Sequence, residues 1–266
     1  MTDAPLIDIR NATIYRGDTC VFENLNLTIE QHQPAVVLGP NGSGKTTLLK
    51  TINRELYPVH RKDSWVRILG QEKWNVWKLR SQIGIVSHDL QTRYPGTTTG
   101  LSVVLSGYLS SIGIHGSLAD RIDKNQAKSA TEIMHELGVA AFAHTPLRQM
   151  STGQQRRCLL ARALVHNPHT LILDEPTAGL DLAAAFDYMK RIRQLASQGR
   201  NIVLVTHLLN EIPPDIDRVI LLRKGTIMAD GPKREVLSEN HLRKTYDVDI
   251  RVAEVDGYYL GYPPDS

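Results

Sequence analysis

The chain has 266 residues, of which 41% are hydrophobic, and its formal net charge is +3. This length and apolar content are enough for a sizeable buried core. The small net charge gives no argument for nucleic-acid binding, and we interpret the scattered basic clusters, Arg61-Lys62 and Arg156-Arg157, as a solvated face. The two cysteines, Cys20 and Cys158, match no metal-ligand spacing and suit a reducing cytosol.

Signals for export or membrane insertion are not evident. The first residues, Met1-Thr-Asp-Ala-Pro5, combine neither a basic n-region nor an apolar h-region. No run approaches the roughly 18 to 20 apolar residues of a membrane-spanning helix. We therefore expect a cytoplasmic chain rather than an exported one.

The first strongly patterned segments predict strands followed by a phosphate-binding loop. Leu25–Ile29 alternates apolar and polar residues, and the apolar run Ala35–Leu38 follows. Directly after it stands Gly39-Pro-Asn-Gly-Ser-Gly-Lys-Thr46, which has every fixed position of the P-loop motif, and then a helix-like segment over 47–54. This strand, loop and helix order is the context that the motif requires. The alternative is an ordinary glycine-rich turn at the start of a helix.

A loop of this kind binds phosphates mainly through its main chain. Glycines let backbone N–H groups turn inward on an anion, and the following helix directs its positive dipole end at the same place. Lys45 then reaches the β- and γ-phosphates, where its charge also supports catalysis, and the Thr46 hydroxyl coordinates Mg²⁺. The residues expected to contact the nucleotide are Gly39, Pro40, Asn41, Gly42, Ser43, Gly44, Lys45, Thr46 and Thr47.

The middle of the chain contains a long uncharged region. After the strand-like segment Ile83–Val86, residues 94–119 include no Asp, Glu, Lys or Arg. Ser, Gly and Thr interrupt this region too often for a membrane span. We expect helices that dock on a partner protein, or alternatively an internal core helix with a glycine-rich loop. An amphipathic helix is predicted over 125–137 and a further helix over 156–164.

Two adjacent carboxylates follow a segment with the pattern of a buried strand. Thr170–Leu173 is followed by Asp174 and Glu175. Beside a phosphate loop, Asp174 fits a metal-supporting role through water, and Glu175 is the candidate general base for the water that attacks the γ-phosphate. The alternative is a solvated acidic turn before Pro176.

The last quarter of the chain predicts a strand and a hairpin. Asn201–Val205 is an apolar strand followed by His207, and 218–229 reads as a hairpin. We assign no function to the tail, 247–266.

Taken in order, these motifs resemble those of the ATP-binding cassette (ABC) ATPases, the nucleotide-binding subunits of ABC transporters. Asp174-Glu-Pro-Thr-Ala-Gly-Leu-Asp181 is similar to the family's hydrolysis strand and the loop after it. Met150-Ser-Thr-Gly-Gln-Gln155 stands where the family has its Leu-Ser-Gly-Gly-Gln signature. The resemblance extends from about residue 6 to about residue 237.

The resemblance implies that the signature contacts the γ-phosphate held by the opposite subunit of a dimer. The residues concerned are Ser151, Thr152, Gly153 and Gln154. Thr152 departs from the family pattern by placing a β-branched side chain where the family has glycine, and we expect the contact to survive in weaker form. Ser151 and Thr152 also suit a helix N-cap, which is compatible with that role.

Three further residues receive roles from the resemblance alone. Asp181 communicates across the dimer, His207 senses the γ-phosphate and helps to hold the attacking water, and Tyr15 stacks on adenine. A core tyrosine on an edge strand is the alternative for Tyr15.

The sequence departs most from the family after the strand Ile83–Val86. The family has a glutamine there, whose amide contacts Mg²⁺ and the attacking water, and whose loop faces the membrane partner. This chain has Ser87-His88-Asp89 instead. His88 can still hydrogen-bond a water or coordinate a metal, and Gln91 is the possible substitute.

The expected fold is an α/β P-loop NTPase core with a mixed sheet, an antiparallel N-terminal β-subdomain and an inserted helical subdomain. We predict a single ABC domain over 1–266, with the core and β-subdomain at about 1–87 and 165–246. The helical subdomain with the signature is predicted at about 88–164, followed by the tail.

The expected function is that of a Mg²⁺-dependent ATPase subunit of an ABC transporter. Two copies would bind two ATP molecules between them and drive a separate transmembrane subunit docked near residues 88–119, at the cytoplasmic face of the membrane. Two alternatives remain open. One is a soluble ABC-type ATPase that acts on a protein assembly, and the other is a nucleotide-dependent sensor with little turnover.

Overall fold

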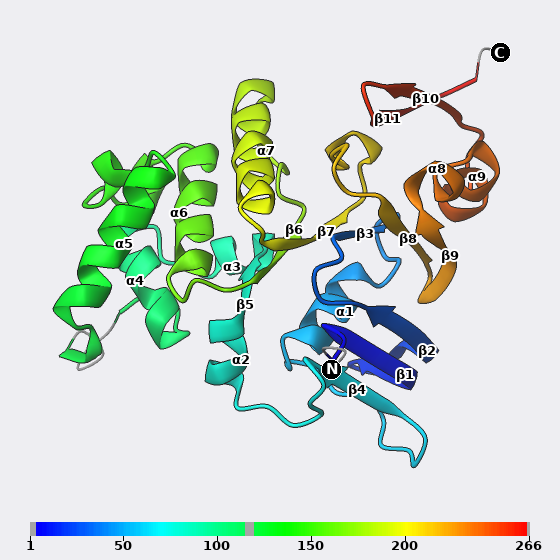
Figure 1. The fold of residues 1–266 in the computed structure, drawn as a ribbon, viewed down its shortest axis with the longest axis horizontal. Helices are drawn as coiled ribbons and strands as arrows, with labels where there is room; N and C mark the ends of the chain where they lie inside the picture. The colour runs from blue at the N-terminus through cyan, green and yellow to red at the C-terminus, as the bar shows by residue number, and fades with distance from the viewer. Residues whose placement is uncertain (1–3, 115–119, 265–266) are drawn as a thin grey trace. The chain divides into compact units, whose positions relative to one another are not determined.

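The computed structural model describes residues 4–114 and 120–264 (Figure 1). The chain divides into two compact units, one of residues 1–76 with 201–266 and the other of residues 77–200. The last part of the uncharged region, residues 115–119, lies outside the described residues.

The first unit begins with an antiparallel sheet. Strands β1 (Ile7–Arg16), β2 (Thr19–Ile29) and β4 (Trp65–Ile68) pair in the order β2-β1-β4. Ile7 lies opposite Ile29 on one side and Ile68 on the other, and all three are fully buried. Alternating burial along these strands places one apolar face on the core, as the sequence pattern indicates. The predicted antiparallel β-subdomain is confirmed.

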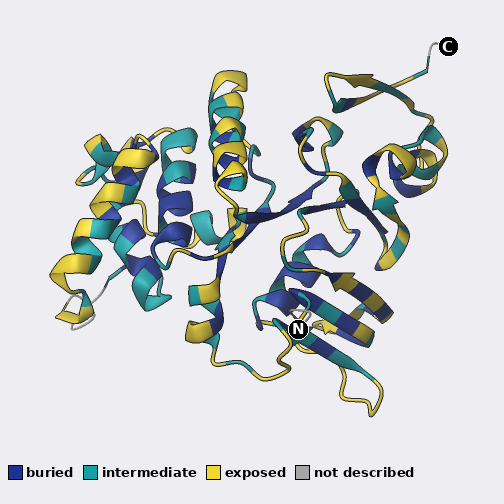
Figure 2. Ribbon diagram, viewed as in Figure 1, coloured by how far each residue is buried: buried dark blue, intermediate teal, exposed yellow. Residues whose placement is uncertain are grey.

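A parallel arrangement forms the core of the same unit. Strands β7 (Asn201–Thr206), β3 (Ala35–Leu38) and β8 (Arg218–Arg223) are parallel neighbours in that order, and β9 (Thr226–Pro232) adds antiparallel to β8. Every residue of β3 and β7 is buried, which explains their unbroken apolar sequences (Figure 2). Helix α1 (Lys45–Ile52) follows the loop after β3. The mixed sheet and the hairpin expected over 218–229 are therefore present.

The C-terminal part of this unit has structure that we did not predict. Helices α8 (Lys233–Val236) and α9 (Glu239–Tyr246) precede an antiparallel hairpin of β10 (Arg251–Val255) and β11 (Tyr258–Tyr262), drawn in red in Figure 1. The turn between the two strands has positive φ at Asp256 and Gly257. An Asp-Gly pair between short strands is a strong hairpin signal, so the sequence did contain the information.

The second unit contains two parallel strands with helices around them. Strands β5 (Ile83–Val86) and β6 (Thr170–Asp174) pair with Val86 opposite Leu173. Helix α2 (Val76–Gln82) precedes β5, the short α3 (His88–Thr92) follows it, and α7 (Leu182–Ser197) follows β6.

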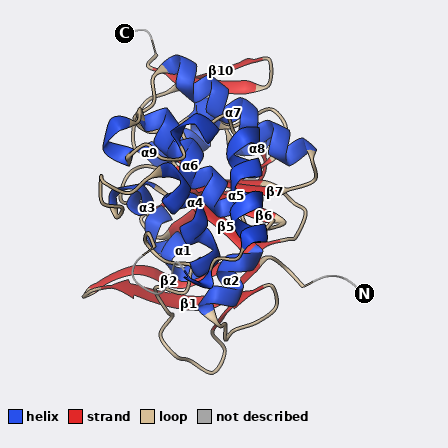
Figure 3. Cartoon of the chain, turned by 90° about the vertical axis from the view of Figure 1, so that its left-hand side faces the viewer, coloured by secondary structure: helices blue, strands red, loops and turns tan. Residues whose placement is uncertain are grey.

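Three helices, α4 (Gly100–Leu109), α5 (Lys124–Glu136) and α6 (Thr152–Leu164), gather in this unit (Figure 3). Short 3₁₀ turns occur at 140–142 and 147–149. A Cβ on Gly107 would lie 2.4 Å from the Arg162 carbonyl oxygen, so the small residues of α4 let its backbone pack closely on α6. This part of the uncharged region thus has the internal packing of the core-helix alternative.

No helix among the described residues has the length and apolarity needed to cross a bilayer.

Candidate functional site

The phosphate loop lies at the carboxyl ends of the parallel strands of the first unit. Leu38, the last residue of β3, lies opposite Thr206 at the end of β7, and the Gly39 N–H donates to the Thr206 carbonyl oxygen at 3.2 Å. A Cβ on Gly39 would lie 2.1 Å from the carbonyl oxygen of Leu222, so only glycine fits where the loop begins. The carboxyl edge of parallel strands is where α/β folds bind ligands.

The second half of the loop depends on a backbone conformation that other residues rarely adopt. Gly44 has φ 114°, and a Cβ there would lie 2.8 Å from Cζ of Phe22 on β2. The Ser43 carbonyl oxygen accepts a 2.8 Å hydrogen bond from the Gly225 N–H in the turn between β8 and β9. The loop is therefore fixed both by its own dihedral angles and by neighbouring main chain.

Polar groups of this loop suit an anion. Lys45 is 6% exposed, and its Nζ donates to the carbonyl oxygens of Gly39 at 2.7 Å and Pro40 at 3.0 Å, which holds the ammonium over the loop. Within the described part of the chain, the buried Ser43 Oγ has no hydrogen-bond partner. A buried hydroxyl without a partner is costly. Loop N–H groups, an ammonium and an unsatisfied hydroxyl together fit a bound phosphate.

Two more predicted residues belong to this unit. His207 directly follows Thr206, so its main chain lies at the same edge of the sheet as the phosphate loop. Tyr15 lies near the end of β1 and is 45% exposed. Its neighbour Ile14 pairs with Phe22, the residue that abuts Gly44. The fold therefore brings His207 to the phosphate loop and places Tyr15 on a strand close to it, with a ring accessible for stacking.

The two adjacent carboxylates of the second unit follow strand β6. Asp174 ends the strand, and Glu175 has φ 46°, in the left-handed region. That conformation is uncommon for any residue with a Cβ, and a residue before proline normally prefers extended backbone. Strain of this kind is concentrated at functional sites.

The signature residues form the start of helix α6. Ser151 Oγ accepts from the Gln154 N–H at 3.3 Å, and the Gln154 side chain accepts from the Ser151 N–H at 2.9 Å, which makes a capping box. Gly153 lies against the start of α7, where a Cβ would be 3.3 Å from that of Ala184. The Asp181 side chain caps α7 by accepting from the Ala184 N–H at 2.8 Å. The capping alternative for Ser151 is therefore present, and the signature lies beside the Asp181 loop.

Helix α3 carries both candidates for the missing glutamine. Gln91 Nε2 donates to the Gln155 side chain on α6 at 2.8 Å, and its own Oε1 is buried without a partner among the described residues. His88 is exposed, and its Nδ1 lies 3.4 Å from Nη2 of Arg156. Of the two, His88 has the more accessible side chain, whereas Gln91 is directed at α6.

Arg156 corrects one of our sequence-based interpretations. It is fully buried rather than part of a solvated face, and besides its contact with His88 its Nη2 donates to the Ala178 carbonyl oxygen at 3.3 Å. Burial raises the pKa of Tyr188, and the guanidinium of Arg156 opposes that rise. The position could have been found from helical periodicity, since it shares a face with three buried residues: Leu159, Leu160 and Ala163.

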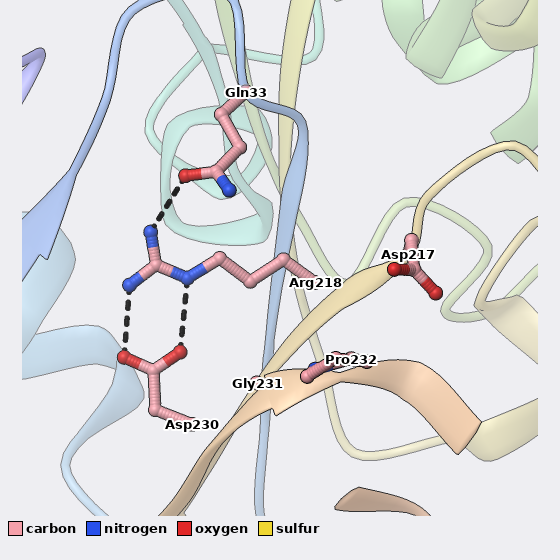
Figure 4. Close-up of a pocket in the computed structure, with 6 residues that line it drawn as sticks. All are labelled: Gln33, Asp217, Arg218, Asp230, Gly231 and Pro232. Carbon is pink, nitrogen blue, oxygen red and sulfur yellow. Dashed lines mark hydrogen bonds and ion pairs between the residues drawn. The ribbon is translucent and has the colours of Figure 1, made fainter. Parts of the chain in front are cut away.

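A separate hollow of about 350 Å³ lies in the first unit (Figure 4). It is at the amino ends of β3 and β8, because Arg218 pairs with Ala35, and so at the opposite end of these strands from the phosphate loop. The Arg218 guanidinium is bound to both carboxylate oxygens of Asp230, at 2.9 and 2.8 Å, and to Gln33 at 2.9 Å. These bonds give the Arg218 guanidinium its partners within the protein. It is therefore not available to bind an anion, as the polar groups of the phosphate loop are.

The predicted residues therefore form one group in each unit. The first group is the phosphate loop with His207 and, nearby, Tyr15. The second group consists of the segments that follow β5 and β6 and of the signature. Side chains of α6 contact both segments. Thr46 and Asp174, predicted to share one Mg²⁺, belong to different units.

Comparisons with known proteins give the family. The family model described as ABC transporter matches residues 22–178, which is more than half of the chain. The chain is 30% identical over 252 residues to the ABC transporter ATP-binding protein YlmA of Bacillus subtilis, covering 93% of each chain.

Solved structures agree on the fold. A metal-chelate type ABC transporter in an inward-facing conformation matches with a TM-score of 0.76 at 22% identity, over 97% of this chain and 96% of that one. A dimeric bacterial ABC transporter cassette matches with a TM-score of 0.68 at 27% identity, over 86% of this chain and 99% of that one. The phosphate loop, the ordered motifs and these matches lead to one conclusion: the chain belongs to the ABC transporter family, as an ATP-binding subunit with the ATPase cassette fold.

Proposed function

We propose that this subunit hydrolyses ATP between two copies of itself and thereby drives a separate membrane protein. The observation that carries the proposal is the phosphate loop, which combines a buried Lys45 ammonium, an unsatisfied Ser43 hydroxyl and a turn at Gly44 whose backbone conformation favours glycine. The nine loop residues, 39–47, hold the phosphates of ATP, and Tyr15 stacks on the adenine ring.

Hydrolysis is assigned to three side chains. Glu175 accepts a proton from water as the water oxygen bonds to the γ-phosphorus, while the bond to the bridging oxygen breaks and ADP leaves with the electron pair. Lys45 stabilises the negative charge on the γ-phosphate, and His207 orients the attacking water.

Oxygen ligands of the kind that Mg²⁺ prefers come from the Thr46 hydroxyl and, through water, from the Asp174 carboxylate. When bound, the ion supplies positive charge to the phosphate oxygens. On helix α3, His88 is our choice for the residue that contacts the attacking water, because its side chain is exposed whereas Gln91 donates to Gln155.

The second copy contributes the signature. Ser151, Thr152, Gly153 and Gln154 open helix α6, whose N–H groups and dipole suit the γ-phosphate of the nucleotide held by the other copy. Asp181 lies beside them at the start of α7 and carries the signal between copies. Similarity to a dimeric cassette supports this arrangement.

The membrane partner docks near residues 88–119, on the cytoplasmic side. YlmA and the metal-chelate type transporter are described as parts of ABC transporters, which supports a membrane partner for this chain over a purely soluble assembly.

The test uses the Glu175→Gln variant, which retains the shape of the side chain but cannot accept the proton. With ATP and Mg²⁺ we expect hydrolysis to fall by about 10² to 10⁴-fold and a dimer of twice the monomer mass in light scattering. The matched control is Glu132→Gln, an exposed residue of α5. Normal hydrolysis by Glu175→Gln would show that the base is wrong.

The same trapped variant identifies the partner. Tagged Glu175→Gln protein is incubated with ATP and with solubilised membranes or cytosol of the native host, and bound proteins are identified by mass spectrometry. Recovery of a multi-spanning membrane protein supports the transporter function. Recovery of soluble proteins alone, from membranes shown to be solubilised, contradicts it and favours a soluble ABC-type ATPase.

A further inference from the structure

The loop that carries His207 is held by a network of its own. The buried Thr206 hydroxyl donates to the carboxylate of Glu211, which is 5% exposed, and accepts from the Leu208 N–H at 3.0 Å. These bonds close the turn between β7 and the 3₁₀ segment η4 (Leu209–Glu211). The Leu208 N–H belongs to the peptide between residues 207 and 208, so the turn itself holds one side of that peptide. The other side is the His207 carbonyl group.

The C-terminal segment provides that outside contact. The phenol of Tyr246, the last residue of α9, donates to the His207 carbonyl oxygen at 3.1 Å. Burial raises the pKa of Tyr246, so its hydroxyl stays protonated and can donate throughout the neutral range. One hydrogen bond thus joins residues that are 39 positions apart in the chain.

The hairpin adds packing to this hydrogen bond. Strand β11 lies on η4, and the missing Cβ of Gly261 makes room for Leu209 and Ile250, whose Cδ1 atoms lie 2.9 and 2.6 Å from where that Cβ would be. The tail, for which the sequence suggested no function, therefore covers the segment that directly follows His207.

This C-terminal segment is itself anchored to the first unit. Arg223 at the end of β8 donates to the Lys244 carbonyl oxygen and pairs with Asp247 at 3.4 Å. The Lys233 ammonium, on a side chain that is nearly buried, donates to the carbonyl oxygens of Pro214 at 3.1 Å and Gly257 at 3.2 Å. The segment is thus fixed on either side of Tyr246, at Lys244 and Asp247, and again at the turn of its hairpin, so Tyr246 is held in a defined position.

We propose that Tyr246 is a positioning residue for His207, with the C-terminal hairpin as its support. The hydrogen bond anchors the carbonyl side of the peptide that follows His207, while Thr206 holds the N–H side, and a shift of this main chain would move the His207 side chain with it. The inference rests on the proposed role of His207 in ATP hydrolysis. It predicts an effect on turnover and not on nucleotide binding, because Tyr246 touches no residue of the phosphate loop among its described contacts.

The first test is Tyr246→Phe, which removes the hydroxyl and retains the ring. A neutral hydrogen bond contributes about 0.5–1.5 kcal/mol, so we expect kcat to fall by about 2- to 12-fold. The KM for ATP should match that of Tyr57→Phe, the same substitution at an exposed residue outside the hairpin. The thermal unfolding midpoint of Tyr246→Phe should fall slightly, because one part-buried hydrogen bond is lost. An unchanged kcat, or a loss of kcat that is matched by weaker ATP binding, overturns the proposal.

A double-mutant cycle asks whether Tyr246 acts through His207. Single-turnover hydrolysis with excess protein is compared for the parent, His207→Ala, Tyr246→Phe and the double variant. We expect Tyr246→Phe to have no further effect once His207 is absent. An equal loss in both backgrounds overturns the inference alone. Normal hydrolysis by His207→Ala would instead remove the proposed role of His207 and the inference with it.

Discussion

The phosphate loop and helix α3 are both short segments that follow a parallel strand, but they are held in place in different ways. The loop is fixed by its own backbone, with Gly44 at φ 114° and main-chain hydrogen bonds from Gly39 and Gly225. Helix α3 is held by side chains of α6, through Gln155 and Arg156, more than 60 positions later in the chain. The first arrangement can be recognised from a motif, because its determinants are local. The second depends on which side chains the fold brings together.

The largest loss of unfolding free energy is expected for Arg156→Ala, in the region that is held by side chains of α6. Truncating this fully buried side chain removes its hydrogen bond to Ala178 and its contact with His88 and leaves a cavity, at a combined cost of about 3–5 kcal/mol. The adjacent Arg157→Ala is the control, because its partly exposed pair with Asp187 at 3.5 Å is worth at most about 1 kcal/mol. Urea unfolding measures the free energy of unfolding of both variants. Equal losses in Arg156→Ala and Arg157→Ala would contradict a special contribution of Arg156 to stability.

Lys45→Ala tests the phosphate loop. Its ammonium would make charge-assisted hydrogen bonds to phosphate, each worth about 1.5–3 kcal/mol, so two lost bonds weaken ATP binding by at least about 100-fold. Titration with a fluorescent ATP analogue measures the Kd. Lys62→Ala, the same charge change at an exposed residue of the first unit, should leave it unchanged. Retained binding by Lys45→Ala would remove the loop as the nucleotide site.

The backbone conformation of the loop predicts that Gly44→Ala loses unfolding free energy, though less than Arg156→Ala. A residue with a Cβ is strained at φ 114° by about 1–3 kcal/mol, and it would also meet Phe22. Gly17→Ala is the control, since φ is 61° there and no atom lies within 4 Å of the added Cβ. We expect Gly17→Ala to lose about 1 kcal/mol of unfolding free energy. The loss in Gly44→Ala should be larger. Equal losses would mean that the loop adapts to a Cβ.

On helix α3, His88→Ala and Gln91→Ala should act on different quantities. If His88 contacts the attacking water, its removal lowers kcat by about 2- to 5-fold. Removing the hydrogen bond of Gln91 to Gln155 lowers stability by about 1 kcal/mol and leaves kcat unchanged. Steady-state hydrolysis and urea unfolding are measured on both variants. Unchanged kcat in both would exclude α3 from hydrolysis.

At neutral pH the smallest effect concerns the buried thiol of the signature helix, because its contribution to stability changes only in alkali. Burial raises the pKa of Cys158 from 9.0 to about 12, so the folded protein retains a proton that the unfolded chain releases above pH 9. Stability should therefore fall as the pH rises from about 9 to about 12, and Cys158→Ala should show less of that fall. The exposed Cys20→Ser serves as the control. An identical alkaline slope in Cys158→Ala and the parent would contradict this.

The expectations from sequence were strongest where chemistry and local structure coincide. The phosphate loop has its fixed glycines between an apolar strand and a helix, so its fold could be predicted without knowledge of the neighbours. The buried strand before Asp174 and the capped helix after Ser151 followed from the same local rules. The hairpin after Ile250 was missed although Asp256-Gly257 signals it, because its strands are short and half exposed.

By itself, the sequence determined the family, the strands and helices that carry its motifs, and the residues that could bind phosphate, because each depends on residue types at fixed short spacings. Only the tertiary structure decided that Arg156 is buried against His88 and Ala178, that Gln91 is directed at Gln155, and that Tyr246 reaches the carbonyl of His207. These contacts join residues that lie 22 to 68 positions apart. Packing of whole elements sets such contacts, and no local pattern specifies which partner a side chain will meet.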